Sequence, residues 1–74
     1  YHLKTHKVRE ASIISKFIVI KNYYGTKCAI RKTRIDSVIE NTDEDDDELT
    51  TIWVEGEQYG STESFEAIMA KLEE

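Results

Sequence analysis

The stretch of residues 49–72 limits what this chain can fold into more than any other part of it. Ile52 and Val54 alternate with Trp53, and this period of two is typical of a pleated strand. Gly56 follows as a residue that accepts a positive φ angle, which tight hairpin turns require. The pattern therefore predicts a β-hairpin.

The register of this hairpin has two alternatives. The tight turn is either Glu55-Gly56 or Gly56-Glu57. Both alternatives leave Tyr59 on the same face as Ile52 and Val54, because side chains alternate along a strand. We predict that this face of the sheet is the core face.

A helix is predicted after the hairpin, over residues 62–72. Ser61 and Thr62 are residue types whose side chains accept from the free amides of a helix start, and Glu63 adds an acid to the first turn. Four apolar residues follow at i, i+3, i+4 and i+7, which places them on one stripe of the helix. They are Phe65, Ile68, Met69 and Leu72. This stripe is predicted to close the core.

Residues 13–31 are predicted to form another hairpin. With Tyr23-Tyr24-Gly25 as a three-residue loop, Gly25 takes the left-handed position that such loops need. Cys28 is then interpreted as a small core residue, because a nucleophilic thiol needs a nearby His or helix N-terminus and the local sequence offers neither. One face of the hairpin carries Ile18, Ile20, Cys28 and Ile30, and the other carries Phe17, Val19, Ala29 and Arg31.

Residues 35–40 are predicted to form a short third strand, or a helical turn leading into one, and residues 41–48 a solvated, mobile loop. Six consecutive acids fill most of this loop, but the glycine and the spaced terminal acid of an EF-hand are missing. The chain is therefore predicted to be an α+β domain with one C-terminal helix. Its antiparallel sheet of about five strands is small and strongly bent, or else barrel-like.

Residues 13–74 are predicted to make up this single domain, and residues 1–12 a mobile or accessory N-terminal arm. His2 and His6 stand four residues apart, the spacing of two metal ligands on one helix face. Neither a third ligand nor the acid of an HExxH motif accompanies them, so no metal site is predicted.

Composition argues against several classes of protein. The single cysteine, Cys28, excludes an internal disulfide and favours a cytoplasmic location. The longest apolar run is residues 17–20, far shorter than the roughly 18 residues of a membrane-spanning helix.

Residues 1–40 hold nine Lys or Arg and three acids, whereas residues 41–74 hold one Lys and twelve acids. The net charge of −5 thus conceals a basic half and an acidic half.

A set of core and turn residues within residues 16–72 follows a recognisable pattern. The set consists of Phe17, Ile18, Val19, Ile20, Gly25, Ile30, Ile35, Val38 or Ile39, and residues 51–56 and 63–68. This pattern resembles the small proteins of the flagellar and swarming-motility FlbD-like family and similar phage and prophage proteins. The resemblance implies a small antiparallel sheet with a C-terminal helix, a cytoplasmic protein and no known catalytic residues to carry over. We therefore predict a non-enzymatic accessory protein of phage or prophage type.

The main functional prediction is a protein-binding or self-associating module. The registers above place an apolar group on the sheet face opposite the core, and a group of that size on a small domain is typical of an interface. The candidate interface residues are Phe17, Val19, Ala29 and Trp53. Alternatively, the N-terminal segment covers this face within the monomer.

Two further hypotheses use charge. Basic residues combined with tyrosines on the first hairpin suit nucleic acid, although the acids of the second half oppose it. The residues concerned are Lys21, Tyr23, Tyr24, Lys27, Arg31, Lys32 and Arg34. The acidic loop suits a mimic of nucleic acid that blocks a basic surface on a host protein. Its residues are Asp43, Glu44, Asp45, Asp46, Asp47 and Glu48.

Enzymatic function is not predicted. The sequence has no local Ser/His/Asp motif, no HExxH, no Gly-rich phosphate loop and no CxxC, so neither catalytic residues nor cofactors are assigned. The expected partner is a protein or a second copy of the chain, while nucleic acid is disfavoured and a membrane is not expected.

Overall fold

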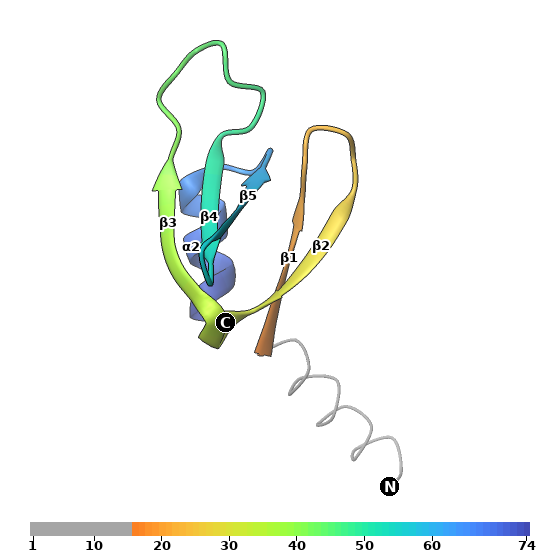
Figure 1. Cartoon of the computed structure of the whole chain (residues 1–74), viewed down its shortest axis with the longest axis vertical. Coiled ribbons are helices and arrows are strands. Elements are labelled where there is room, and N and C mark those ends of the chain that lie inside the picture. Colours follow the sequence, from red (N-terminus) through yellow and green to blue (C-terminus); the bar gives the residue numbers. More distant parts are fainter. Residues whose placement is uncertain (1–15) are drawn as a thin grey trace, which may run out of the picture.

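The computed structural model describes residues 16–74, which form five strands and one α-helix (Figure 1). The predicted arm, residues 13–15 and the histidine pair His2 and His6 lie outside the described residues. The strands are β1 (Phe17–Lys21), β2 (Lys27–Arg31), β3 (Ile35–Glu40), β4 (Thr50–Val54) and β5 (Glu57–Ser61). A short 3-10 helix, η1 (Lys32–Arg34), joins β2 to β3, and α2 spans Phe65–Glu73. The predicted α+β class is confirmed.

The first hairpin has the predicted register. Ile18 pairs with Ile30 and Ile20 with Cys28 across the antiparallel β1–β2 ladder. Gly25 has a φ of 85°, the left-handed conformation that its place in the three-residue loop requires.

The second hairpin selects one of its two predicted turns. Val54 pairs with Glu57, so the turn is Glu55-Gly56, with φ angles of 50° and 86°. Two consecutive positive φ angles are typical of the tight turn whose twist matches that of the flanking strands. Tyr59 pairs with Ile52 and packs against the core, as predicted.

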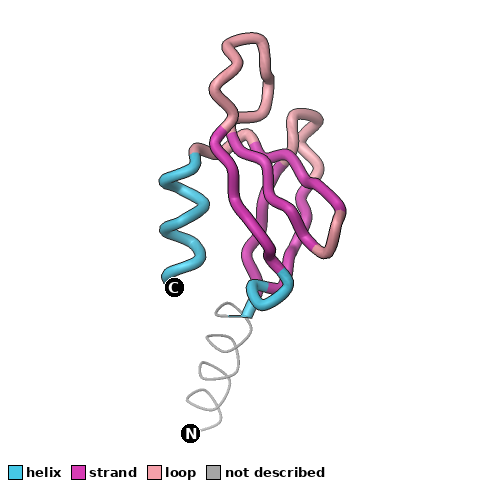
Figure 2. The backbone as a smooth tube through the Cα atoms, turned by 60° about the vertical axis from the view of Figure 1, so that its left-hand side comes forward, coloured by secondary structure: helices cyan, strands magenta, loops and turns pink. Residues whose placement is uncertain are grey.

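The strands form two sheets and do not close into a barrel, so the barrel-like alternative is wrong (Figure 2). β1 and β2 make one sheet, and β3, β4 and β5 make the other, in the order β3-β4-β5. The physical reason is η1, which carries the chain from β2 to β3 without pairing the two strands. The sheets meet where β5 ends, because the Thr62 N–H donates to the Lys21 carbonyl over 2.9 Å.

A cluster of five isoleucines forms the core. Each is at most 5% exposed, and together they join both sheets to the helix. Half-buried Cys28 and Leu72 pack against this cluster, which agrees with their predicted core roles. The five are Ile18, Ile20, Ile30, Ile52 and Ile68.

The helix begins later than predicted, at Phe65 instead of Thr62. Ser61 still belongs to β5, and Thr62 is held at the edge of β1 by its backbone amide. Ser64 is the N-cap, and its hydroxyl accepts from the Ala67 N–H over 3.1 Å. Of the predicted stripe, Ile68 is fully buried, whereas Met69 is 36% exposed.

Lys71 fastens the helix to β1. Its ammonium group donates to the Val19 carbonyl over 2.6 Å and forms an ion pair with Glu63. Thr62 and Lys71 therefore occupy two outward-facing carbonyls of β1, at Lys21 and Val19. Within residues 16–74, no helix has the length and apolar content to span a membrane.

Candidate protein-binding surface

Two connections that are distant in sequence meet at one end of the domain. They are the β1–β2 loop, with Tyr23 and Tyr24, and the loop of residues 41–49 between β3 and β4 (Figure 1). β1 and β3 each run towards this end of the domain, and their antiparallel partners β2 and β4 run back from it. Both loops therefore emerge at the same end (Figure 1). Between them lies a groove of about 410 Å³. It is lined by Tyr23, Tyr24, Asp43, Asp45, Asp46, Asp47 and Glu48.

The acidic loop is organised by its own hydrogen bonds. At its base, the Asn41 N–H donates to the Leu49 carbonyl and the Asn41 side-chain amide donates to the Glu48 carbonyl, both over 2.9 Å. Within the loop, the Asp43 carboxylate accepts from the Asp45 N–H over 3.0 Å. The Asp46 carboxylate accepts from the Glu48 N–H over 3.2 Å. The loop expected to be only solvated and mobile thus has a defined internal structure.

Glu48 connects the acidic loop to the first hairpin. Its carboxylate accepts from the Tyr23 N–H over 2.9 Å, across 25 positions of sequence. The same carboxylate lies over Gly60, where it fills the space that a Cβ atom would occupy. The absence of a side chain at Gly60 therefore permits the contact that closes one wall of the groove.

Replacing Gly60 by Ala is expected to expel the Glu48 carboxylate from this position. The end of a flexible side chain moves easily, so the loss of stability should be small, on the order of 1 kcal/mol or less. The Tyr23 amide should then exchange its hydrogen faster, as it should in Glu48→Ala. Amide hydrogen exchange measures this. Unchanged protection of Tyr23 in both variants would contradict the assignment, and Glu66→Ala on the exposed face of α2 is the control.

The two tyrosines are held in an exposed arrangement. Tyr24 is 86% exposed and Tyr23 is 55% exposed, with ring centroids 5.3 Å apart and an interplanar angle of 77°. Asn22 fixes their backbone, because its side-chain oxygen accepts from the Tyr24 N–H over 3.0 Å and the Thr26 N–H over 2.9 Å. Such rings offer apolar area and π faces to a ligand. Because their backbone is already fixed, binding costs little conformational entropy.

The carboxylates of the groove have two different roles. Those of Asp43, Asp46 and Glu48 accept backbone hydrogen bonds and so shape the loop. Among the hydrogen bonds of residues 16–74, none uses the carboxylates of Asp45 and Asp47, which also line the groove. Carboxylates beside π faces suit a guanidinium or ammonium group.

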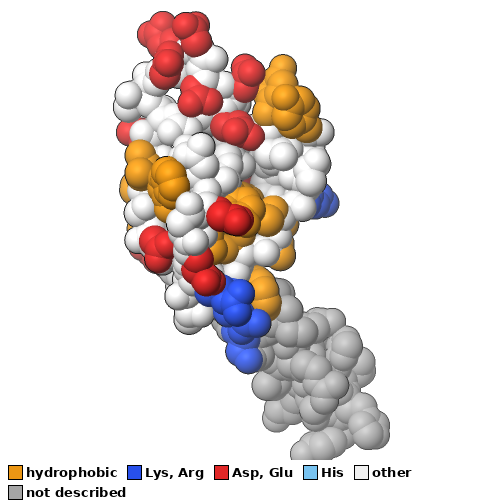
Figure 3. Space-filling model, in the orientation of Figure 1, with side chains coloured by type: hydrophobic (Ala, Val, Ile, Leu, Met, Phe, Trp, Pro, Cys, Tyr) orange, Lys and Arg blue, Asp and Glu red, His pale blue; other side chains and the backbone are white. Residues whose placement is uncertain are grey.

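Arg31 and Arg34, which the nucleic-acid hypothesis also uses, lie away from this groove. In Figure 3 the largest group of basic side chains lies at the end of the described domain opposite to the acidic loop, while acids and exposed apolar side chains share the loop end. The Arg31 guanidinium lies 5.0 Å above the Phe17 ring, and Arg34 pairs with Glu55 at 3.4 Å. Arg31 and Arg34 thus contact residues outside the groove, whereas Lys21 and Lys27 pair at the base of the tyrosine loop, where the Lys21 side chain lies next to Gly25.

The four residues predicted to form an apolar interface are divided between the two sheets. Phe17, Val19 and Ala29 lie on the β1–β2 hairpin, where Val19 is 49% exposed. Trp53 lies on β4, half-buried between its cross-strand neighbours Ser37 and Gln58. Their role as an interface stays a prediction.

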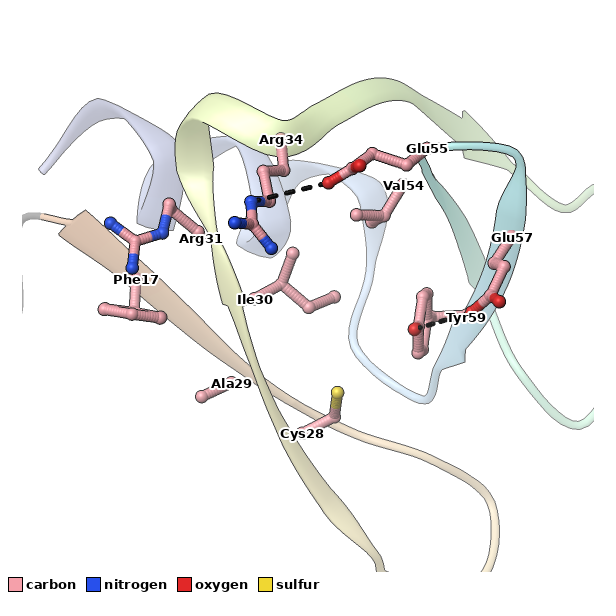
Figure 4. Close-up of a pocket in the computed structure, with 10 residues that line it drawn as sticks. All are labelled: Phe17, Cys28, Ala29, Ile30, Arg31, Arg34, Val54, Glu55, Glu57 and Tyr59. Carbon is pink, nitrogen blue, oxygen red and sulfur yellow. Dashed lines mark hydrogen bonds and ion pairs between the residues drawn. The ribbon is translucent and has the colours of Figure 1, made fainter.

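A second cavity, of about 470 Å³, opens between β2 and the β4–β5 hairpin (Figure 4). Its charged groups already have partners, as Figure 4 shows for Arg34 with Glu55 and for Tyr59 with Glu57. The Tyr59 hydroxyl donates to the Glu57 carboxylate over 3.1 Å. This hydrogen bond and the negative charge of Glu57 raise the pKa of Tyr59 above its ordinary value. Cys28 also lines this cavity.

Within residues 16–74, no three His, Cys, Asp or Glu side chains are placed together to hold a metal ion. Sequence reasoning considered the tyrosines and the acids separately and missed the groove between them. The available signal was that the first and third connections of an antiparallel meander emerge at the same end. Comparisons of the chain with family models, curated proteins and solved structures gave no match.

Proposed function

We propose that this domain is a non-enzymatic protein-binding module that takes a basic segment of a partner protein into the groove between its tyrosine loop and its acidic loop. The observation that carries this proposal is the placement of Tyr23 and Tyr24, both largely exposed, beside Asp45 and Asp47. A Lys or Arg side chain of the partner would pack its aliphatic part on a ring and direct its charge to a carboxylate.

The physical chemistry of the groove favours a protein partner over nucleic acid. Five carboxylates in one groove repel phosphate and attract cations, and this attraction speeds the first encounter with a basic surface. The tyrosines supply the aromatic anchors in which the binding energy of an interface is usually concentrated. One form of this proposal agrees with the family resemblance. In it, the domain is an accessory protein of phage or prophage type that covers a nucleic-acid-binding surface of a host protein.

A binding titration tests the proposal. The probe is a synthetic decapeptide of alternating arginine and glycine, and calorimetry at low and at moderate salt measures its affinity. Asp45→Asn with Asp47→Asn should weaken binding markedly, whereas Glu66→Gln with Glu73→Gln, which remove the same charge from the exposed face of α2, should weaken it little. Tyr24→Ala should cost about 1–2 kcal/mol, or roughly tenfold in affinity.

Two outcomes would contradict the proposal. One is equal weakening by the loop and helix substitutions, which would mean that only net charge attracts the peptide. The other is tighter binding of a single-stranded oligonucleotide than of the peptide, with loss of that binding in Arg31→Gln with Arg34→Gln, which would instead support the nucleic-acid hypothesis.

A further inference from the structure

We propose that two copies of this chain associate by pairing β2 of one copy with β3 of the other in an antiparallel register. Within residues 16–74, β2 pairs only with β1, and β3 only with β4, so each has an outer edge without a strand partner. Unpaired edges of this kind are templates for a further strand. This inference is independent of the groove at the loop end of the domain.

Backbone hydrogen bonds show which residues of β2 face outward. The Asn22 N–H donates to the Thr26 carbonyl, so the ladder of the hairpin continues through the pairs Ile20 with Cys28 and Ile18 with Ile30. Directions alternate along a strand. The backbone N–H and C=O groups of the remaining β2 residues therefore point away from β1. These residues are Lys27, Ala29 and Arg31, all with exposed side chains.

The same reasoning applies to β3. The Asn41 N–H donates to the Leu49 carbonyl, so the ladder with β4 continues through Ile39 with Thr51 and Ser37 with Trp53. The backbone groups of Val38 and Glu40 thus point to the outer edge. The register shifts between Ile35 and Ser37, which marks the intervening Asp36 as a bulged residue at the start of this edge.

The two edges complement each other in one antiparallel register. If Ala29 of one copy lies opposite Val38 of the other, then Lys27 lies opposite Glu40 and Arg31 reaches Asp36. The outward-facing N–H and C=O groups of the two strands then face each other. Each of the two charged pairs joins a basic and an acidic side chain. The alternative of β3 with β3, centred on Val38, would place Asp36 opposite Glu40, and like charges in direct opposition destabilise a sheet.

A second copy is the occupant that these features identify. Within one chain, η1 directs β2 and β3 into different sheets, so the two complementary edges do not pair. Thr62 and Lys71 obstruct the outer edge of β1, whereas the side chains that flank the β2 and β3 edges are mainly exposed. The pairing therefore uses two edges that have no strand partner within residues 16–74.

Charge reversal tests the pairing. Sedimentation equilibrium over a range of concentrations should show association of the unaltered chain that weakens with salt. Lys27→Glu alone and Glu40→Lys alone should each raise the dissociation constant about tenfold or more, because like charges then face each other. The double variant Lys27→Glu with Glu40→Lys should restore association. Glu73→Lys, which changes the charge of the helix by the same amount as Glu40→Lys, is the control and should associate like the unaltered chain.

A proline variant provides a second test. The Ala29 N–H points away from β1, so Ala29→Pro removes an edge donor without removing a hydrogen bond of the hairpin. Circular dichroism should show an unchanged fold, and association should be lost. A chain that stays monomeric at every concentration would overturn the proposal. So would association that survives both single reversals and the proline, or a double reversal that fails to restore it while the fold is intact.

Discussion

Replacing Ile68 by Ala is expected to leave most of the domain unfolded at room temperature. Ile68 is the buried residue of α2, fully removed from solvent, and it packs with isoleucines of both sheets. Large-to-small substitutions at such sites cost about 2–5 kcal/mol, because lost burial adds to the cost of a cavity. A core of this size supplies only about 3–5 kcal/mol of net stability. The single substitution therefore removes most of what holds the domain together.

Met69→Ala is the matched control, since it truncates the next residue of the same helix. Met69 is 36% exposed, and Ala favours helix, so this change should cost less than about 1 kcal/mol. Urea unfolding followed by tryptophan fluorescence and by far-UV circular dichroism measures both variants. If Ile68→Ala lost no more stability than Met69→Ala, the helix would not be part of the core, and the assignment of the core would be wrong.

The second largest effect is expected for Thr50→Val. Thr50 is fully buried, and its hydroxyl donates to the Glu63 carbonyl over 2.7 Å. Valine keeps the shape but leaves that carbonyl without this donor, which costs about 1–3 kcal/mol where water cannot replace it. The bond holds the connection between β5 and α2, where Ser61, also fully buried, accepts from the Glu63 N–H over 3.1 Å.

Thr51→Val tests whether burial causes the effect. Thr51 also donates a side-chain hydrogen bond, to the Asn41 side-chain oxygen over 3.0 Å, but it is only half-buried on the opposite face of β4. Water can replace its hydrogen bond, so the cost should stay below about 1 kcal/mol. Thermal unfolding compares the two variants. Equal losses would show that the Thr50 hydroxyl is not sealed from solvent.

The elements of the fold could be predicted from the sequence because their signals are local. The isoleucines of the first hairpin and the alternation around Trp53 define faces, and Gly25 and Gly56 sit at turns where a positive φ is required. The start of the helix was less predictable, because Ser61, Thr62 and Ser64 are all residue types that can act as its cap. The backbone contact of Thr62 with Lys21, 41 positions away, delays the start to Phe65.

The arrangement of the two sheets was not readable from any local pattern. Whether β2 pairs with β3 depends on the path of the backbone through η1. From their sequence, the residues of η1 predict only a polar turn and not its direction. The interface prediction with Trp53 had the same weakness, since it assumed one continuous sheet. The groove was missed for a different reason. Its walls were both recognised, but the contact between Glu48 and Tyr23 that joins them has no sequence signature.

The most direct test of the central claim, that the loop end of the domain binds a basic partner, is a nuclear magnetic resonance titration of the labelled chain with the arginine–glycine decapeptide. Amide shifts should concentrate at Tyr23, Tyr24 and residues 43–48, and they should vanish when Asp45 and Asp47 are replaced by Asn. Shifts confined to the helix or the outer face of the β1–β2 hairpin, or none at all, would contradict it.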